Sequence, residues 1–207
     1  ELDTLVPDSP HKPYDIKQVI DAVKGAGATE IRVVVGHGEA LVRKVVEPMG
    51  VVCYPQQNQW GTGDAVKAAD PGTLKGDVLI LAGDHPLIEP SDIEFILREF
   101  RDRKCDLAVV STIVKDGGKF GRIIRHHGEL RAIVEAADAG ADTLKINEIN
   151  TGIYVMTVET LNDYLPRIQN HNSKKEYYLT DIVAIARDDG RAVPTLLADA
   201  LAKALDL

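Results

Sequence analysis

The chain has 207 residues, which is enough for one domain with a full hydrophobic core. It carries 32 acidic and 24 basic residues, for a formal net charge of -8, so we expect no nucleic-acid partner and no binding to acidic membranes. No apolar run is long enough to cross a membrane, and Cys53 and Cys105 lie in apolar runs typical of buried free thiols. These features predict a cytoplasmic protein.

Strand-like and helix-like patterns alternate along the first half of the chain. Continuous apolar runs predict buried strands at 31–36, 51–54, 77–83 and 106–114. Apolar residues at helical spacing predict helices at 16–23, 42–49, 61–70 and 93–100, with capping boxes that start at Asp15 and Ser91. This alternation implies βαβ units, so we predict an α/β fold with a mainly parallel, mixed sheet flanked by helices. The run at 77–83 is predicted to be the most buried strand.

The pattern changes from about residue 116. Two short strands over 121–135 are predicted to join at a turn of His127 and Gly128, and another strand is predicted at 149–156. Thr157 is placed to cap the helix that follows, and 176–190 carries a further helical face. No internal repeat or linker interrupts the chain, so we expect residues 1–207 to form a single domain.

The strand predicted at 77–83 ends by presenting Asp84. In open parallel α/β sheets, ligands bind outside the carboxyl ends of the strands. A carboxylate there suits Mg²⁺, which takes one or two protein oxygens together with water and substrate phosphate oxygens. A second interpretation, that Asp84 only caps a turn before Pro86, remains open at this point.

The segment "QQNQWGTGDAV" at 56–66 could bind a nucleotide. Gly61 and Gly63 around Thr62 would let backbone N–H groups approach an anion at a helix start. Gln56 and Gln59 could read a base edge through amide hydrogen bonds. Alternatively, the glycines form an ordinary helix-initiating turn, and Trp60 is only a packing residue.

Several polar residues stand beside buried segments, among them Glu135, Asn150 and the group Glu176, Tyr178 and Thr180. Taken alone, each is more typical of a structural hydrogen bond or a helix cap than of a substrate contact. The histidines and cysteines lack the spacing of a zinc site, and no Walker A or dinucleotide-binding glycine pattern occurs.

Taken together, the segments resemble one enzyme family. In order, these are "VVVGHG", "QNQWGTGDAV", "LAGDHPLI", "FGRIIR", "IVEAADA", "EINTGIYV" and "EYYLTDIVAIA". They resemble the pyrophosphorylase (uridylyltransferase) domain of the bifunctional bacterial N-acetylglucosamine-1-phosphate uridylyltransferase and glucosamine-1-phosphate acetyltransferase family. The match runs from about Ile16 to Val193, and its last two segments are the most specific.

The resemblance implies a Rossmann-like nucleotidyltransferase fold, with residues 1–115 as a nucleotide-binding half and residues 116–207 as a sugar-binding half. It implies transfer of a uridylyl group from UTP to N-acetylglucosamine 1-phosphate, which makes a cell-wall precursor. Asp84 would bind a catalytic Mg²⁺, and Gly83 beside it would also contact substrate. Gln56, Gly61 and Thr62 would contact the uracil and its surroundings.

The same resemblance assigns the sugar side of the site. Gly121, Glu135 and Asn150 would hold the N-acetylglucosamine through backbone and side-chain hydrogen bonds. Glu176, Tyr178 and Thr180 would line the pocket around it.

The sequence also departs from the family. It opens with "ELDTLVPDSPHKPYD" in place of a first strand and a glycine-rich loop, and Lys12 does not match the family's phosphate-binding lysine well enough to be assigned. The absence of a central first strand would leave its neighbours unpaired. The tail after Val193 has no asparagine to act as a second metal ligand.

No hexapeptide repeat occurs, so we expect no left-handed β-helix domain and no acetyltransferase activity in this chain. Regions outside this chain could form an oligomer. We expect an enzyme, provided that the full molecule contains the glycine-rich loop. Two other functions remain open: a related nucleotidyltransferase with a different acceptor, and a non-catalytic protein of the same fold.

Overall fold

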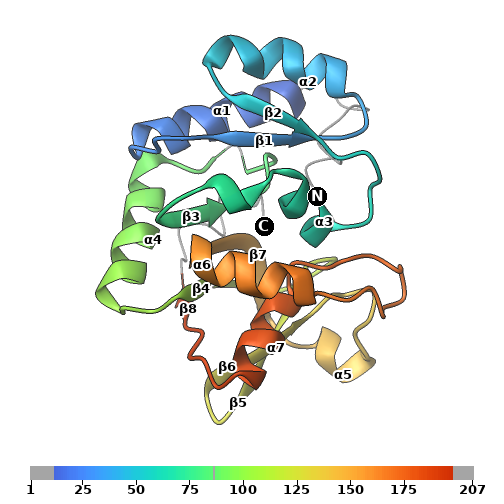
Figure 1. The fold of residues 1–207 in the computed structure, drawn as a ribbon. Coiled ribbons are helices and arrows are strands. Elements are labelled where there is room, and N and C mark those ends of the chain that lie inside the picture. The colour runs from blue at the N-terminus through green and yellow to red at the C-terminus, as the bar shows by residue number, and fades with distance from the viewer. Residues whose placement is uncertain (1–11, 86, 198–207) are drawn as a thin grey trace.

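The computed structural model describes residues 12–85 and 87–197, without the side chains of residues 12–15. The helices are α1 (Lys12–Gly25), α2 (Glu39–Val46), α3 (Thr62–Ala68), α4 (Pro90–Asp102), α5 (Ala141–Leu144), α6 (Val158–Tyr164) and α7 (Asp181–Asp188) (Figure 1). The strands are β1 (Arg32–Val35), β2 (Val52–Pro55), β3 (Asp77–Ile80), β4 (Leu107–Ile113), β5 (Arg122–His126), β6 (Glu129–Val134), β7 (Glu148–Thr157) and β8 (Thr195–Leu197). Short 3-10 helices lie at Glu47–Met49, Pro71–Thr73 and Leu165–Arg167.

These strands form two sheets. β1 pairs with β2 in a parallel two-stranded sheet, and the other six strands form a sheet with the order β6-β5-β7-β4-β8 and β3 also paired to β7. The predicted mixed α/β fold with flanking helices is therefore confirmed (Figure 1).

The prediction of a mainly parallel sheet is confirmed for the direction in which most strands run. It is wrong for the pairing of neighbouring strands. In the large sheet β3, β4, β5 and β8 run one way, whereas β6 and β7 run the other way. Because β7 is inserted among strands of the opposite direction, four of the five ladders in the described part of this sheet are antiparallel.

The centre of the large sheet is β7, not β3. Ile153, Val155 and Met156 of β7 are fully buried, whereas the residues of β3 are exposed or only partly buried. The prediction that 77–83 forms the most buried strand is therefore wrong. The reason is that β3 pairs with β7 alone among the described strands, as β1 pairs with β2 alone. Residues 1–11, where the family would have its first strand, lie outside the described part of the chain.

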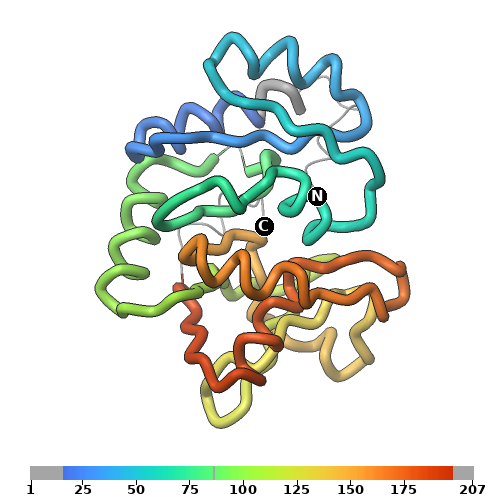
Figure 2. Tube along the Cα trace, viewed as in Figure 1, coloured from blue at the N-terminus to red at the C-terminus, as the bar shows by residue number. Residues whose placement is uncertain are grey.

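Buried side chains gather in three apolar clusters. The first cluster combines β4 and β7 with the hairpin of β5 and β6 and with α6 and α7. The second packs α1 and α4 against β4 and β7. The third lies between α1, α2 and β1 and includes Val51, which directly precedes β2. Figure 2 traces the backbone in the same view as Figure 1, from blue at the N-terminus to red at the C-terminus. The second half of the chain thus contributes its central strand to a sheet that begins in the first half, and the single-domain organisation remains a prediction.

The structure confirms the helix cap predicted at Thr157 and contradicts the capping boxes predicted at Ser91 and Asp15. The Thr157 hydroxyl accepts the Thr160 N–H at 3.2 Å at the start of α6, as predicted. His127 and Gly128 both have positive φ values of 52° and 82°, as a tight hairpin turn requires. The predicted capping box at Ser91 is wrong, because α4 begins at Pro90 and its capping box joins Glu89 to Asp92.

The capping box predicted at Asp15 is also wrong, because α1 already begins at Lys12.

Within the described residues, no helix combines the length and the apolar composition that a membrane crossing needs. The predicted cytoplasmic location stays a prediction.

We predict that Ile153→Ala lowers the free energy of unfolding by about 3 kcal/mol, because it removes a fully buried side chain from the central strand. Ile113→Ala is the matched control, since Ile113 is a strand residue that is half exposed, and it should cost only about 0.5 kcal/mol. Urea unfolding monitored by circular dichroism measures both variants. Equal losses would contradict the assignment of β7 as the core strand.

Candidate functional site

Asp84 lies in the turn that follows β3, beyond the carboxyl end of that strand. Its side chain is 53% exposed, and its carboxylate Oδ1 lies 3.8 Å from Nδ1 of His85. Among the described residues, no backbone N–H donates a hydrogen bond to this carboxylate, so the interpretation of Asp84 as a turn cap gains no support. Its oxygens face solvent beside a buried ring.

His85 is buried and holds this turn in place. Its Nδ1 lies 3.0 Å from the Ala82 carbonyl oxygen, and its Nε2 lies 3.0 Å from the Thr151 carbonyl oxygen of β7. The backbone carbonyl of His85 also accepts the Ile88 N–H at 3.1 Å, which begins the turn toward α4. The sequence placed His85 next to the candidate ligand but gave no sign of these contacts.

Asn150 lies where β7 departs from regular pairing. Gly152 has a φ of 80°, and the ladder with β4 shifts register between Val109 and Ser111. Within this irregular stretch, Asn150 Oδ1 accepts the Gly152 N–H at 3.0 Å, and Asn150 Nδ2 donates to the Tyr154 hydroxyl at 2.8 Å. The Asn150 side chain therefore has a fixed orientation, which defines the edge of the site in β7.

The predicted sugar-side residues come together around Glu135. The Thr180 hydroxyl donates to Glu135 Oε1 at 3.1 Å, and the Gly121 carbonyl accepts the Asn150 N–H at 2.9 Å. A Cβ atom on Gly121 would lie 2.9 Å from Ile133 Cγ2 and 3.4 Å from Glu135 Oε2, so only glycine fits without displacing them. Residues from β5, β6, β7 and the start of α7 thus share one small region.

The charge around this region is negative. Burial, followed by the charges of Asp138, Glu176 and Glu135, raises the pKa of the Tyr178 hydroxyl to about 12. Burial and the neighbouring Asp138 also raise the pKa of the Asp181 carboxyl. Tyr178 therefore stays a neutral hydroxyl across the physiological pH range, surrounded by carboxylates.

The predicted nucleotide-side residues pack directly against the segment that contains Glu176, Tyr178 and Thr180. The Gly63 N–H donates to the Tyr177 carbonyl at 2.7 Å, and the Thr62 hydroxyl accepts the Leu179 N–H at 2.9 Å. A Cβ atom on Gly61 would lie 2.7 Å from the Tyr177 carbonyl oxygen and 2.9 Å from Glu176 Cβ. The chain therefore brings residues more than a hundred positions apart into contact.

These contacts change two expectations for 56–66. The Gly63 N–H is already bonded to Tyr177, so the idea that it faces an anion is wrong. Gln56 Nε2 donates both to the Gly61 carbonyl at 3.2 Å and to Asp64 Oδ2 at 2.8 Å. With both amide hydrogens engaged, Gln56 can offer a ligand only its oxygen, which is an acceptor.

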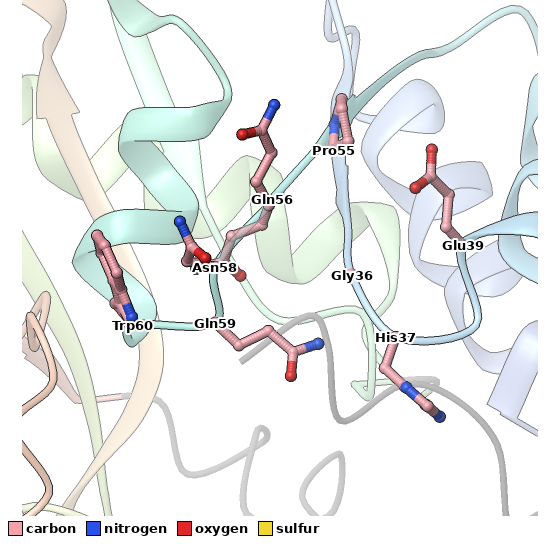
Figure 3. Close-up of a pocket in the computed structure, with 9 residues that line it drawn as sticks. Gly36, His37, Glu39, Pro55, Gln56, Asn58, Gln59 and Trp60 are labelled. Atoms are coloured by element: carbon pink, nitrogen blue, oxygen red, sulfur yellow. The ribbon is translucent and has the colours of Figure 1, made fainter.

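An open pocket of about 600 Å³ lies at the carboxyl ends of β1 and β2. It is lined by Gly36, His37, Glu39, Pro55, Gln56, Gln57, Asn58, Gln59 and Trp60 (Figure 3). Figure 3 shows Gln59 and His37 extending to one side of the two loops, while Gln56 and Trp60 extend to the other. Trp60 is 54% exposed at this pocket.

Within the described residues, no group of three or more His, Cys, Asp or Glu side chains is arranged to hold a metal ion. Asp84 is therefore a single carboxylate at the rim of the sheet. The tail at 198–207 and the side chain of Lys12 lie outside the described part of the chain.

The chain is similar to known nucleotide-processing proteins. Residues 14–146 match the family model described as a MobA-like NTP transferase domain. The chain is 60% identical over 174 residues to the bifunctional protein GlmU of Bdellovibrio bacteriovorus, with 84% of this chain and 38% of that protein covered. It is 38% identical over 186 residues to the GlmU of Clostridium beijerinckii, with 89% and 41% covered. The chain thus spans about two fifths of the length of these curated relatives.

Solved structures support the fold alone. A proposed glucose-1-phosphate thymidylyltransferase from Bacillus anthracis, in complex with sucrose, superposes with a TM-score of 0.70 at 19% identity and covers 98% of this chain and 86% of that one. A UDP-glucose pyrophosphorylase in complex with UDP-glucose gives a TM-score of 0.65 at 16% identity, with 98% and 87% covered. The MobA-like family model covers well over half of the chain. The chain therefore belongs to the family of MobA-like NTP transferase domains and is a nucleotidyltransferase.

Proposed function

We propose that the chain transfers a uridylyl group from UTP to N-acetylglucosamine 1-phosphate, giving UDP-N-acetylglucosamine and pyrophosphate. The observation that carries this proposal is the direct packing of the nucleotide-side turn at Gly61 and Thr62 against the sugar-side segment at 176–180. A nucleotide and a sugar phosphate that bind to these two groups would meet at one place. The relatives named GlmU support the same reaction, although the chain covers only about two fifths of their length.

The base would bind beside Gln56. Because both hydrogens of Gln56 Nε2 are engaged by Gly61 and Asp64, its free amide atom is an acceptor. The N3–H of uracil is a donor and matches this acceptor, whereas the unprotonated N3 of cytosine does not. Gly61, whose carbonyl accepts one of these hydrogen bonds, has a positive φ of 105°, which favours glycine at this position.

The triphosphate would lie toward Asp84. A half-exposed single carboxylate at a strand end suits Mg²⁺, which completes its shell with water and phosphate oxygens. When bound, Mg²⁺ would neutralise phosphate charge and act as a Lewis acid on the phosphate that reacts. Asp84 is held in place by the turn at 82–85, in which the ring of His85 contacts the Ala82 and Thr151 carbonyl oxygens.

The acceptor sugar would bind between Glu135, Asn150 and Gly121. Carboxylate and carbonyl oxygens accept hydrogen bonds from sugar hydroxyls and from the N–H of an acetamido group. The surrounding carboxylates of Asp138, Glu176 and Asp181 repel a phosphate, so the 1-phosphate would point away from them and toward the Asp84 side.

The reaction needs no general base from the protein. A sugar phosphate oxygen is already ionised, so it can form the new bond to the α-phosphorus of UTP while the bond from that phosphorus to pyrophosphate breaks. Catalysis is then mainly a matter of position and charge neutralisation. The residues described above fix the two reactants at the rim of the sheet.

A related nucleotidyltransferase with another acceptor, such as a different sugar phosphate or the molybdopterin cofactor, is the second candidate. The match to the MobA-like model favours it, because that match assigns nucleotide transfer without an acceptor.

We predict that Asp84→Asn lowers kcat/KM for pyrophosphate release by at least about 100-fold, because the amide binds Mg²⁺ far more weakly than the carboxylate. Asp142→Asn is the matched control, since Asp142 is 95% exposed on α5, and it should behave as the unsubstituted chain does. The two variants are compared at the same UTP concentration and at the Mg²⁺ concentration that half-saturates the unsubstituted chain. Near-normal turnover of Asp84→Asn would remove Asp84 from the mechanism.

We also predict that N-acetylglucosamine 1-phosphate is preferred over glucose 1-phosphate by about 10-fold or more in kcat/KM, because a polar site loses a hydrogen bond with the acceptor that lacks the acetamido group. Glu135→Gln should reduce this preference, whereas Glu129→Gln on the exposed end of the same hairpin should preserve it. Equal turnover of both acceptors by the unsubstituted chain would favour the second candidate.

A further inference from the structure

The pairing of β3 with β7 stops just before the candidate site. The last paired residues are Ile80 and Tyr154, and beyond them Gly152 adopts a positive φ of 80°. Thr151 is 2% exposed, and within the described residues β3 no longer pairs with β7 at this position. A buried carbonyl left without a donor would cost free energy, so this position needs a hydrogen bond from somewhere else.

The ring of His85 supplies that hydrogen bond. Its Nε2 lies 3.0 Å from the Thr151 carbonyl oxygen, and the ring is 3% exposed. Its Nδ1 lies 3.0 Å from the Ala82 carbonyl oxygen in its own turn. Carbonyl oxygens only accept, and a neutral imidazole carries one N–H, so the ring donates to the Thr151 carbonyl when that hydrogen is on Nε2. In that tautomer the ring replaces a ladder bond to Thr151 and lies against the Ala82 carbonyl of its own turn.

This contact connects the two halves of the candidate site. On one side, His85 adjoins Asp84 and lies 3.8 Å from its carboxylate. On the other side, Thr151 adjoins Asn150, and the Thr151 hydroxyl donates to the Val110 carbonyl of β4 at 2.8 Å. Beyond the end of the β3–β7 ladder, the imidazole of His85 therefore links the Asp84 turn to the residue next to Asn150.

We propose that His85 is a positioning residue that sets where Asp84 lies relative to Asn150, and so places the metal-bound nucleotide relative to the acceptor sugar. This role rests on the proposed function, because it assumes that Asp84 serves Mg²⁺. His85 itself does not touch substrate. Its effect passes through the Nε2 hydrogen bond to Thr151.

Two substitutions separate the two ring contacts. The amide nitrogen of glutamine is as many bonds from Cα as the histidine Nε2, whereas the amide nitrogen of asparagine matches Nδ1. His85→Gln can therefore keep the bond to Thr151, and His85→Asn can keep only the bond to Ala82. Both variants lose the aromatic ring, so a difference between them reports on the bond to Thr151.

The measurement is pyrophosphate release from UTP and N-acetylglucosamine 1-phosphate as a function of Mg²⁺ concentration. We expect His85→Asn to raise the half-saturating Mg²⁺ concentration by about 10-fold and to lower kcat, as loss of an outer partner of a metal ligand does. His85→Gln should stay within about threefold of the unsubstituted chain in both quantities. Thermal unfolding of each variant gives the folded fraction.

Two results would overturn the proposal. One is an equal Mg²⁺ dependence in both variants. The other is a loss of turnover in His85→Asn that follows the folded fraction, with the half-saturating Mg²⁺ concentration unchanged, because that would show a purely structural role.

A second readout does not depend on activity. In the unsubstituted chain, the Nε2–H proton of His85 should appear in a ring ¹H–¹⁵N correlation spectrum and exchange slowly with water, unlike the rings of the exposed His126 and His127. If the chain shows no turnover at all, the proposed function fails while this proton still tests the contact. A His85 ring proton that exchanges as fast as those of the exposed histidines would contradict the hydrogen bond from Nε2 to the Thr151 carbonyl.

Discussion

The candidate site depends on the end of the ladder between β3 and β7. While the two strands pair, they lie side by side in one ladder from Asp77 opposite Thr157 to Ile80 opposite Tyr154. The positive φ at Gly152 and the Asn150 side chain that bonds the Gly152 N–H end this pairing within one turn. The strands then diverge, so that Asp84 faces solvent on one side and Asn150 borders the sugar-side residues on the other.

Charge divides the site into two functional regions. The carboxylates around Tyr178 make the sugar side suited to hydroxyl and N–H donors and unsuited to phosphate. The nucleotide side offers an amide acceptor at Gln56 and a single carboxylate at Asp84. A sugar phosphate between these regions has one favourable orientation, with its phosphate toward the nucleotide. Binding and catalysis in the proposed reaction therefore follow from the same arrangement of charges.

The sequence predicted the individual elements better than their arrangement. Apolar runs and the cap at Thr157 report local structure, so most helices and strands were found within a few residues. The direction of β7 could not be read, because an apolar strand has the same pattern whichever way it runs. The short β8 and the role of His85 were missed for a similar reason, since both depend on partners far along the chain. The contact of Thr62 with the segment at 176–180 also needs the folded chain, although both motifs were visible in the sequence.

The most direct test of this account is a crystal structure of the chain with UDP-N-acetylglucosamine and Mg²⁺. The account predicts that the diphosphate lies beside Asp84, that the uracil N3–H reaches Gln56, and that the acetamido sugar lies between Glu135 and Asn150. A product molecule bound elsewhere on the surface would contradict it, as would a sugar seated away from the place where the ladder of β3 and β7 ends.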